Sequence, residues 1–398
     1  MKRNALFAFL FLLPFFSVAQ INPFVPKKDL MAIIDKNLKD AVPQYKYLMK
    51  TLPADRLTKT FQDGKLVTSD SGWWCSGFYP GTLLYLYEAT KDQSLYDEAI
   101  SRLKLLEKEQ NNTHTHDLGF MMYCSFGNAN RIKPSAEYKA ILTQSAKSLS
   151  TRFNDKVGCI RSWDRKAPEF WVIIDNMMNL ELLTWATRNS DNDPSFRNIA
   201  LIHANTTIKN HFRPDYSSFH VVVYDDNTGA IIRKQTAQGA ADNSAWSRGQ
   251  AWGLYGYSMM YRETKAPKYL EQAKHIADFI LKNPNLPADK IPYWDYNAPK
   301  IPNTPRDASA AAVMASAFIE LSSYVDADSG RKYLDAAETI LRILSKPQYK
   351  AKTGENGGFL LKHSVGSLPG KSEVDVPLTY ADYYFVEAML RYQKLAKR

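Results

Sequence analysis

One helical pattern recurs along this chain of 398 residues, and it constrains the fold more than any other feature. An amphipathic segment opens with an aromatic residue and places Ala or Leu about one helical turn later. Five copies show the pairing: Tyr96/Ala99, Tyr138/Leu142, Phe196/Ala200, Tyr269/Ala273 and Tyr333/Ala337. Because apolar residues recur there at intervals of three and four, each copy is predicted to be a helix that buries one face.

More apolar segments, rich in small residues, alternate with these copies. They read GTLLYLYEAT, DNMMNLELLTWATRN, GQAWGLYGYSMMYRET, ASAAAVMASAFIELSSYV and YADYYFVEAMLRYQKL. A helix that is apolar on most sides belongs in an interior. With a helix near 28–51 and a segment around 119–128, the pattern predicts about six outer and six inner helices. We therefore expect an all-α fold, an (α/α)6 barrel, with an open solenoid of helix pairs as the alternative.

Unusual residues precede or begin the inner segments. In an alternating ring the inner helices all run the same way, so their starts meet at one rim. Helix N-termini favour anions through unpaired N–H groups and the helix dipole. The residues concerned are Trp73-Trp74, His116-Asp117, Asp175, Ser247-Arg248, Arg306-Asp307 and Tyr380. The pattern predicts a site for an anionic ligand at this rim.

The first residues are typical of an export signal. A basic start and an apolar run over 5–16 lead to small residues at 17–19, which predicts a signal peptide over 1–19 and cleavage before Gln20. We expect residues 20–398 to form a single catalytic domain that is periplasmic or secreted. The apolar run is too short to span a bilayer, and no Cys follows it, so we expect no membrane anchor.

Composition narrows the class of ligand. The net charge of +10 and an aromatic content of 13% favour an acidic polysaccharide. Nucleic acid is disfavoured as a ligand, since an exported protein rarely meets it and no long Lys/Arg run occurs.

Cys75, Cys124 and Cys159 match neither a disulfide framework nor a zinc pattern, so free thiols are expected. His211 and His220 lack the spacing of metal ligands, so we expect no metal and no cofactor. We also expect the protein to be a monomer.

Two aspartates are candidates for catalysis. Asp175, in FWVIIDNMMNLELL, is a carboxylate flanked by apolar residues at an inner helix start. Burial of that kind raises a carboxyl pKa toward the range of a general acid. Asp117, in THTHDLGF, is either a second functional carboxylate or the N-cap of the following helix, and position alone leaves both open.

Arg248 and Trp252 lie one turn apart on the same helical face. A guanidinium pairs with carboxylates and stacks on rings, so the two residues predict a cradle for an acidic sugar. A structural Arg–Asp pair beneath a core Trp is the alternative. His220, in SSFH, is interpreted as a hydrogen-bonding partner of the substrate. Two carboxylates, aromatics and an arginine without a cofactor motif indicate glycoside chemistry.

Seven motifs, in order along the mature chain, read HDLGF, VIIDNMMNLELLTWA, DYSSFH, QGAADNSAWSRGQAWGLYGY, IPYWDY, PRDASA and DVPLTYADYYFVEAMLR. Together they resemble the unsaturated glucuronyl hydrolases of glycoside hydrolase family 88. The resemblance implies an (α/α)6 barrel, in agreement with the repeat. It also implies a substrate: the anionic glycosaminoglycan oligosaccharide, of the chondroitin, hyaluronan or heparin type, that a lyase leaves with a 4,5-unsaturated glucuronic acid at its non-reducing end. Protonation of the vinyl ether at C4 and addition of water at C5 then release the remaining sugar.

The resemblance also implies roles for individual residues. Asp175 matches the general acid/base, and Asp117 matches a second essential aspartate. Positions that contact the uronate or line the site are matched by His220, Gln238, Arg248, Trp252, Trp74, His116 and Trp163.

The chain departs from the family in places. Cys75-Ser76 replaces the expected polar pair after Trp74. Ser364, Ser367 and Lys371 resemble, with shifted spacing, a cluster that some members use for a sulfate group, and a solvated loop is the alternative.

Three other functions stay open at this point. An unsaturated rhamnogalacturonyl hydrolase acting on pectin fragments shares the fold and the chemistry. A non-catalytic helical glycan-binding protein is usually lipid-anchored, and a polysaccharide lyase would create the alkene instead of removing it.

Overall fold

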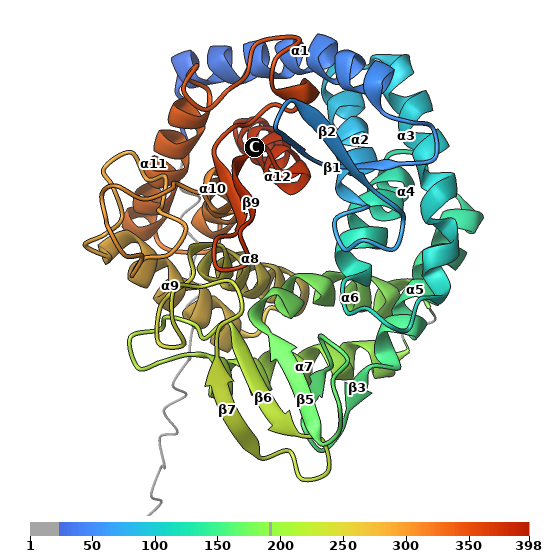
Figure 1. Ribbon diagram of the computed structural model, residues 1–398, viewed down its shortest axis with the longest axis vertical. Helices are drawn as coiled ribbons and strands as arrows, with labels where there is room; N and C mark the ends of the chain where they lie inside the picture. Colours follow the sequence, from blue (N-terminus) through green and yellow to red (C-terminus); the bar gives the residue numbers. More distant parts are fainter. Residues whose placement is uncertain (1–23, 191–192, 398) are drawn as a thin grey trace, which may run out of the picture.

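Outer and inner helices alternate around a closed ring in the computed structural model, which describes residues 24–190 and 193–397 (Figure 1). The outer helices are α1 (Lys28–Thr51), α3 (Gln93–Leu106), α5 (Ala136–Ser150), α7 (Pro194–His211), α9 (Pro267–Lys282) and α11 (Ala327–Leu344). The inner ones are α2 (Phe78–Thr90), a π-helical segment (Gly119–Gly127) continued by α4 (Asn128–Ile132), α6 (Leu180–Asn189), α8 (Ser247–Thr264), α10 (Ala308–Ser322) and α12 (Thr379–Leu395).

The last inner helix packs against the first, α12 against α2, so the ring is closed. The (α/α)6 barrel is thereby confirmed, and the open solenoid is excluded. The predicted signal peptide over 1–19 lies outside the described residues. Within the described ranges, no helix is long and apolar enough to cross a membrane.

Burial follows the repeat. The Ala or Leu of all five aromatic pairs is fully buried, whereas Tyr96 and Tyr138 are only partly buried. Helix α8 buries every residue from Ser247 to Met260. This all-round burial is what an inner helix requires, and its small residues let neighbouring helices approach closely.

Side-chain caps mark where several helices begin. Asp92, Ser135, Asp193 and Asp326 accept hydrogen bonds from backbone N–H groups in the first turns of four outer helices. Asp307 does the same for the inner helix α10. Each cap satisfies N–H groups that have no partner within the helix.

Short antiparallel strands lie in the loops that lead into inner helices. They are β1 (Leu57–Gln62), β2 (Lys65–Ser69), β3 (Phe153–Asn154), β4 (Cys159–Ile160), β5 (Glu169–Ile173), β6 (Val221–Asp225), β7 (Ile231–Gln235), β8 (Ser364–Ser367) and β9 (Ser372–Val376). They form hairpins β1–β2, β3–β4 and β8–β9 and the sheet β5–β6–β7. Figure 1 looks onto the rim that carries the β1–β2 hairpin, β9 and this sheet.

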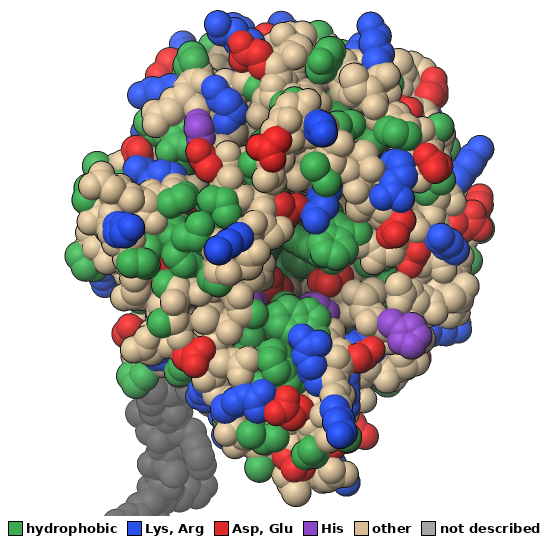
Figure 2. All heavy atoms as spheres, viewed as in Figure 1, with side chains coloured by type: hydrophobic (Ala, Val, Ile, Leu, Met, Phe, Trp, Pro, Cys, Tyr) green, Lys and Arg blue, Asp and Glu red, His purple; other side chains and the backbone are tan. Residues whose placement is uncertain are grey.

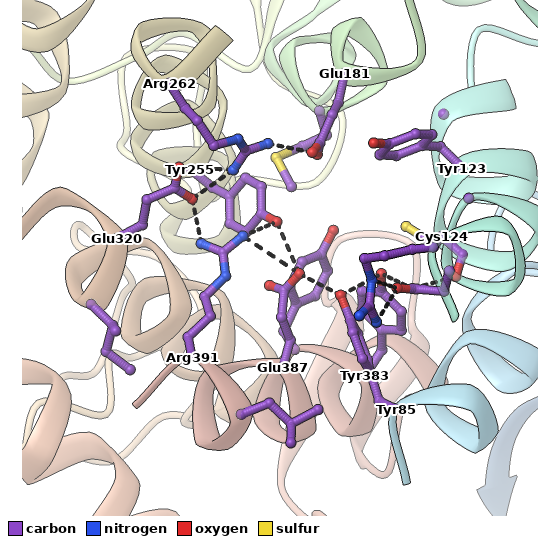
Figure 3. A pocket seen from close by; sticks show the side chains of 18 of the residues that line it. Tyr85, Tyr123, Cys124, Glu181, Tyr255, Arg262, Glu320, Tyr383, Glu387 and Arg391 are labelled. Atoms are coloured by element: carbon purple, nitrogen blue, oxygen red, sulfur yellow. Dashed lines mark hydrogen bonds and ion pairs between the residues drawn. The ribbon is translucent and has the colours of Figure 1, made fainter. Parts of the chain in front are cut away.

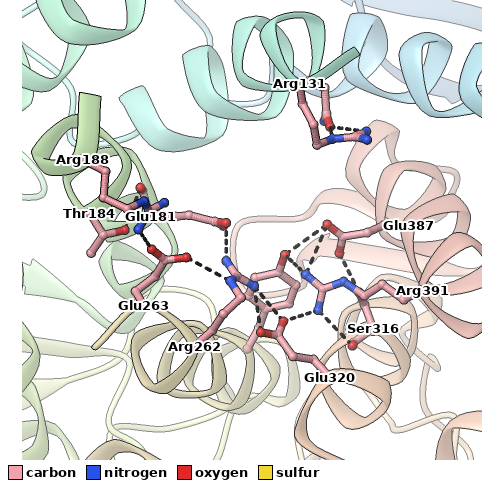
Figure 4. Close-up of polar contacts among 12 residues, drawn as sticks. Arg131, Glu181, Thr184, Arg188, Arg262, Glu263, Ser316, Glu320, Glu387 and Arg391 are labelled. Atoms are coloured by element: carbon pink, nitrogen blue, oxygen red, sulfur yellow. Dashed lines mark hydrogen bonds and ion pairs between the residues drawn. The ribbon is translucent and has the colours of Figure 1, made fainter. Parts of the chain in front are cut away.

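A network of charges ties the inner helices together at the opposite end of the barrel (Figure 4). Arg262 donates from Nη1 to both oxygens of Glu320, at 2.8 and 2.9 Å, and Arg391 contacts the same carboxylate. Glu387 accepts hydrogen bonds from Tyr255 and two other hydroxyls. The network joins α8, α10 and α12.

The same end holds a cavity of about 590 Å³, lined by Tyr85, Tyr123, Tyr255 and these charges (Figure 3). Phe120 and Trp252, whose ring centroids are 5.2 Å apart, belong to the aromatic layer between this cavity and the strand-bearing rim. Because the cavity's arginines are paired with carboxylates, it offers no free charge to an anionic ligand.

Candidate active site

The inner-helix starts converge on the strand-bearing rim, as the sequence predicts. Asp117 precedes the π-helical segment, Asp175 lies in a 3-10 turn (Ile174–Asn179) that leads into α6, and Arg248 begins α8. Asp117 and Arg248 are both close enough to Asp175 to change its pKa. Figure 2 shows a hollow near the centre of this face, with apolar side chains on its wall and acidic and histidine side chains deep within it.

Asp175 is a buried carboxyl with an altered proton affinity. Strand β5 pairs with β6, and the N–H of Ile174 donates to the carbonyl of His220 at 3.0 Å, which fixes the turn that carries Asp175. Burial raises the pKa of Asp175 to about 7, opposed by the charge of Arg248 and reinforced by Asp117. Its Oδ2 has no hydrogen-bonding partner among the described residues. Asp175 is therefore able both to hold and to release a proton near neutral pH.

Asp117 does not cap the helix that follows it. Its side chain accepts no backbone N–H from that helix, and the N–H of Phe120 donates instead to Oδ1 of Asn179 at 2.9 Å. The other end of the Asn179 amide, Nδ2, lies 3.4 Å from Oδ1 of Asp117. The N-cap alternative is thus wrong. Burial raises the pKa of Asp117 to about 7, with Asn179 and Thr115 opposing.

His116 explains how Asp117 can hold a proton. Nδ1 of His116 lies 2.9 Å from the carbonyl oxygen of Ser162, which can only accept, so Nδ1 carries the hydrogen. Burial lowers the pKa of His116 to about 3, so the ring is neutral and its Nε2 is an acceptor. That nitrogen faces Oδ1 of Asp117 at 3.3 Å. A proton on Asp117 would bridge the two groups, whereas a carboxylate would meet a lone pair.

His220 has the opposite tautomer. Its Nδ1 accepts from the backbone N–H groups of Ala237 and Gln238, at 3.1 and 3.2 Å, and burial lowers its pKa to about 3. The hydrogen of this neutral ring therefore sits on Nε2, 3.7 Å from Oδ2 of Asp175. Trp246 packs against the ring with centroids 4.5 Å apart. His220 presents a donor to the space beside Asp175.

Arg248 is already engaged by the protein. It lies 3.3 Å from Oδ2 of Asp307, and it donates to the carbonyl oxygens of Val365 and, at 2.8 Å, Gly366. Its guanidinium lies 4.4 Å from the centroid of the Trp246 ring. The structure thus contains the Arg–Asp pair of the structural alternative.

Trp252 is fully buried, one helical turn from Arg248. Its ring packs against Phe120 and Tyr384, with centroids 5.2 and 5.4 Å away. The helical spacing put both residues on one face, but the arginine turns toward Trp246 because the carbonyls and Asp307 lie there. Substrate contact by Arg248 or Trp252 stays a prediction.

The remaining predicted residues surround this centre. The ring centroids of Trp74 and Tyr380 are 4.9 Å apart, and those of Trp163 and His220 are 6.1 Å apart. Gln238 donates from Nε2 to the carbonyl of Gly366 at 3.1 Å, next to Arg248. A cavity of about 580 Å³ opens beside Asp117. Its lining comprises His114, Thr115, His116, Asp117, Ser162, Trp163, Asp164, Arg165, Trp171, Gln235 and Ala237.

The three residues of the possible sulfate cluster are not joined to one another by any hydrogen bond within the described part of the chain. Ser364 is fully buried, and its hydroxyl has no partner there. Ser367 accepts from the N–H of Gly370 in the β8–β9 turn at 3.2 Å, and Lys371 is exposed at the same turn. A sulfate contact by these residues stays a prediction.

Sequence reasoning missed two residues that organise the site, Asn179 and Trp246. Asn179 follows Asp175 by four residues in DNMMN, and this spacing on one helical face was the available signal. Among the described residues, no cluster of three or more His, Cys, Asp or Glu could hold a metal ion. The three cysteines form no disulfide.

Comparisons with known proteins agree on one family. The profile of Glycosyl Hydrolase Family 88 matches residues 49–262. An unsaturated glucuronyl hydrolase from Formosa agariphila is 49% identical over 325 residues, 81% of this chain and 80% of its own. An unsaturated chondroitin disaccharide hydrolase from Streptococcus pyogenes serotype M1 is 31% identical over 379 residues, 93% of each chain. The crystal structure of an unsaturated glucuronyl hydrolase specific for heparin superimposes with a TM-score of 0.89 at 48% identity, covering 92% of this chain and 98% of that one.

Proposed function

This chain belongs to glycoside hydrolase family 88, and we infer from that premise that it is an unsaturated glucuronyl hydrolase. It removes the 4,5-unsaturated glucuronic acid from the non-reducing end of glycosaminoglycan oligosaccharides. The observation that carries the chemistry is the pair of buried carboxyls, Asp117 and Asp175, each with a pKa raised to about 7. The similarity to a heparin-specific unsaturated glucuronyl hydrolase and to an unsaturated chondroitin disaccharide hydrolase supports heparin and chondroitin oligosaccharides as substrates.

The reaction is a hydration of the ring alkene. Asp175 donates its proton to C4, and the positive charge that develops at C5 is shared with the ring oxygen. Water adds at C5 and loses a proton to the Asp175 carboxylate, which restores the acid. The hemiketal at C5 then opens to a ketone, and its hydroxyl proton passes to the ring oxygen, which becomes the hydroxyl group of a hemiacetal at C1. This hemiacetal collapses to an aldehyde, the bond from C1 to the next sugar breaks, and the leaving oxygen takes the proton of the C1 hydroxyl group.

Asp117 and Asp175 have different surroundings, and these give the two carboxyl groups different roles. When it is protonated, Asp117 shares its proton with His116, and it orients the sugar or the water by hydrogen bonding. Asp175 has a free Oδ2 and is the group that transfers the proton. Because the two charges interact, the pair titrates in coupled steps. General acid catalysis of this kind typically contributes about 10²–10⁴ in rate.

The test is an absorbance assay on lyase-generated disaccharides. Loss of the alkene absorbance of a heparin-type or chondroitin disaccharide supports the proposal. Activity on lyase-treated pectin fragments alone would assign a rhamnogalacturonyl hydrolase. Binding without turnover would assign a glycan-binding protein, and a gain of absorbance from intact polysaccharide would assign a lyase.

We propose further that the protein is exported to the periplasm or the medium and is a monomer. The composition of residues 1–19 supports export to the periplasm or the medium, and the closed barrel supports a monomer. N-terminal sequencing of the exported protein tests cleavage before Gln20. Light scattering tests the monomer, and a stable dimer would contradict it.

A further inference from the structure

The cavity at the end of the barrel opposite the active site has the features of a second binding site. Its volume of about 590 Å³ is typical of a pocket for a small molecule. Two residues of its lining, Arg131 and Lys394, have side chains that are 42% and 55% exposed, so the cavity is open to solvent. The aromatic layer that contains Phe120 and Trp252 separates it from the strand-bearing rim. A ligand can therefore enter it without passing the active site.

One wall of this cavity is the π-helical segment Gly119–Gly127. π-helices are rare in proteins and occur frequently at functional sites. A Cβ added at Gly127 would lie 2.8 Å from the ring of Tyr123, so the glycine leaves the space in which this ring lies. The Tyr123 ring meets that of Trp185, on α6, with centroids 6.4 Å apart and planes inclined by 57°. The two rings form an aromatic corner in the cavity wall.

Two polar groups beside this corner are available to a ligand. Glu181, on α6, binds Arg262 through Oε1, and among the described residues neither its Oε2 nor the hydroxyl group of Tyr123 forms a hydrogen bond. Figure 3 shows the Tyr123 hydroxyl group pointing toward the Glu181 carboxylate, whose charge is close enough to raise the pKa of Tyr123. The hydroxyl groups of Tyr85 and Tyr255, by contrast, already donate to a carboxylate. A donor and an acceptor thus face the same open space, where the hydroxyl groups of one ligand can bind both.

The charges of the lining favour an uncharged ligand. The network within the cavity contributes three carboxylates and two guanidinium groups, those of Glu181, Glu320, Glu387, Arg262 and Arg391. An anion would meet the extra carboxylate in a space that is only partly hydrated, where charges interact strongly. The exposed Arg131 and Lys394 share a single carboxylate, that of Glu88, so a cation would meet their excess positive charge. A ligand without charge avoids both costs.

We propose that this cavity is a second ligand site and that it takes an uncharged monosaccharide. The hydroxyl groups of the sugar bind Oε2 of Glu181 and the hydroxyl group of Tyr123, and the apolar face of its ring packs against Trp185. Uncharged N-acetylhexosamines, which the proposed reaction would release from unsulfated disaccharides, belong to this class. The site itself does not depend on that reaction.

The test is calorimetric titration of the protein with N-acetylgalactosamine. Tyr123→Phe keeps the ring and removes the hydroxyl group, so the Kd is expected to rise about three- to tenfold, the loss that follows from one hydrogen bond. Tyr47→Phe, on the exposed side of α1, removes the same group far from the cavity and leaves the Kd unchanged.

A second pair of variants tests the carboxylate. Glu181→Gln removes the charge of the acceptor and is expected to raise the Kd about tenfold. Glu263→Gln is the matched control, because Glu263 also binds Arg262 but does not line the cavity, and it leaves the Kd unchanged.

Two further measurements assign the place and the class of the ligand. Asp175→Asn, on the other side of the aromatic layer, is expected to bind N-acetylgalactosamine with the wild-type Kd. Glucose 6-phosphate, an anionic sugar, is expected to bind the cavity at least tenfold more weakly.

The absence of binding to the wild type, or equal Kd values for the wild type and Tyr123→Phe, would overturn the cavity site. A Kd changed by Asp175→Asn would place the sugar in the active site instead. Equally tight binding of glucose 6-phosphate, weakened by Tyr123→Phe, would overturn the uncharged class. A wild type that binds N-acetylgalactosamine in the cavity but leaves the alkene of unsaturated disaccharides intact would overturn only the proposed function.

Discussion

Replacing Asp175 by Asn should abolish turnover and at the same time stabilise the protein above neutral pH. Burial raises the pKa of this carboxyl from an ordinary value of 3.8 to about 7, a difference of about three pH units. At about 1.4 kcal/mol per unit, keeping Asp175 ionised in the folded state costs about 4 kcal/mol. The amide that replaces the carboxyl in Asp175→Asn carries no charge, so the variant avoids this cost, and about 4 kcal/mol is the upper limit of its gain.

The direction of the pH dependence follows from the raised pKa. Below pH 4 the carboxyl is protonated in both the folded and the unfolded wild type, and the two proteins differ little. Between pH 4 and 7 only the unfolded chain ionises at this position, so wild-type stability falls relative to Asp175→Asn as pH rises. Above pH 7 the difference is constant.

Urea denaturation at a series of pH values measures this difference directly. Asp175→Asn is expected to gain about 2 to 4 kcal/mol over the wild type between pH 4 and pH 8, while kcat falls at least a hundredfold. If the two stability curves ran parallel from pH 4 to pH 8, Asp175 would be an ordinary ionised carboxylate and the burial argument would be refuted.

Three further predictions concern the site and its support. Asn179→Ala removes the amide that caps the segment at Phe120 and contacts Asp117, so the free energy of unfolding should drop by about 1 kcal/mol and kcat at least tenfold; chemical denaturation and steady-state kinetics measure both. Glu320→Gln leaves the guanidinium groups of Arg262 and Arg391 short of a carboxylate, which should cost about 3 kcal/mol in denaturation without changing the kcat of the folded enzyme; full stability would contradict the account of this network. In the wild type, kcat/KM should decline above pH 7, because the protonated acid is lost there, and a decline that begins below pH 5 would refute the raised pKa.

The architecture was predictable because helical periodicity and residue size act locally. The five aromatic pairs marked the outer helices, and the small residues of 308–322 marked an inner one. Asp175 could also be recognised, since apolar neighbours on both sides predict its burial. Because the inner helices of an alternating ring all run in the same direction, their first residues could be predicted to meet at one rim, and the site with them.

The contacts of Arg248 were beyond such reasoning. Its partners include two backbone carbonyls at Val365 and Gly366, 117 and 118 residues away along the chain. A backbone carbonyl is present at every residue, so no sequence pattern singles out these two. The spacing from Arg248 to Trp252 could be read from the sequence, whereas these acceptors could not.

The ambiguity at Asp117 had a similar origin. An aspartate just before a helix is usually its cap, and only the packing of Asn179 from another segment shows that the cap comes from elsewhere. His116 likewise becomes informative only once Ser162 fixes its tautomer.

Deuterium labelling tests the proposed proton transfer most directly. The wild type is incubated in heavy water with an unsaturated glycosaminoglycan disaccharide, and the products are followed by NMR and by the alkene absorbance. We predict that the alkene disappears, that one deuterium is found at C4 of the uronate-derived product, and that Asp175→Asn produces neither change. Release of the second sugar with the alkene intact, or without deuterium at C4, would contradict protonation of that carbon by Asp175.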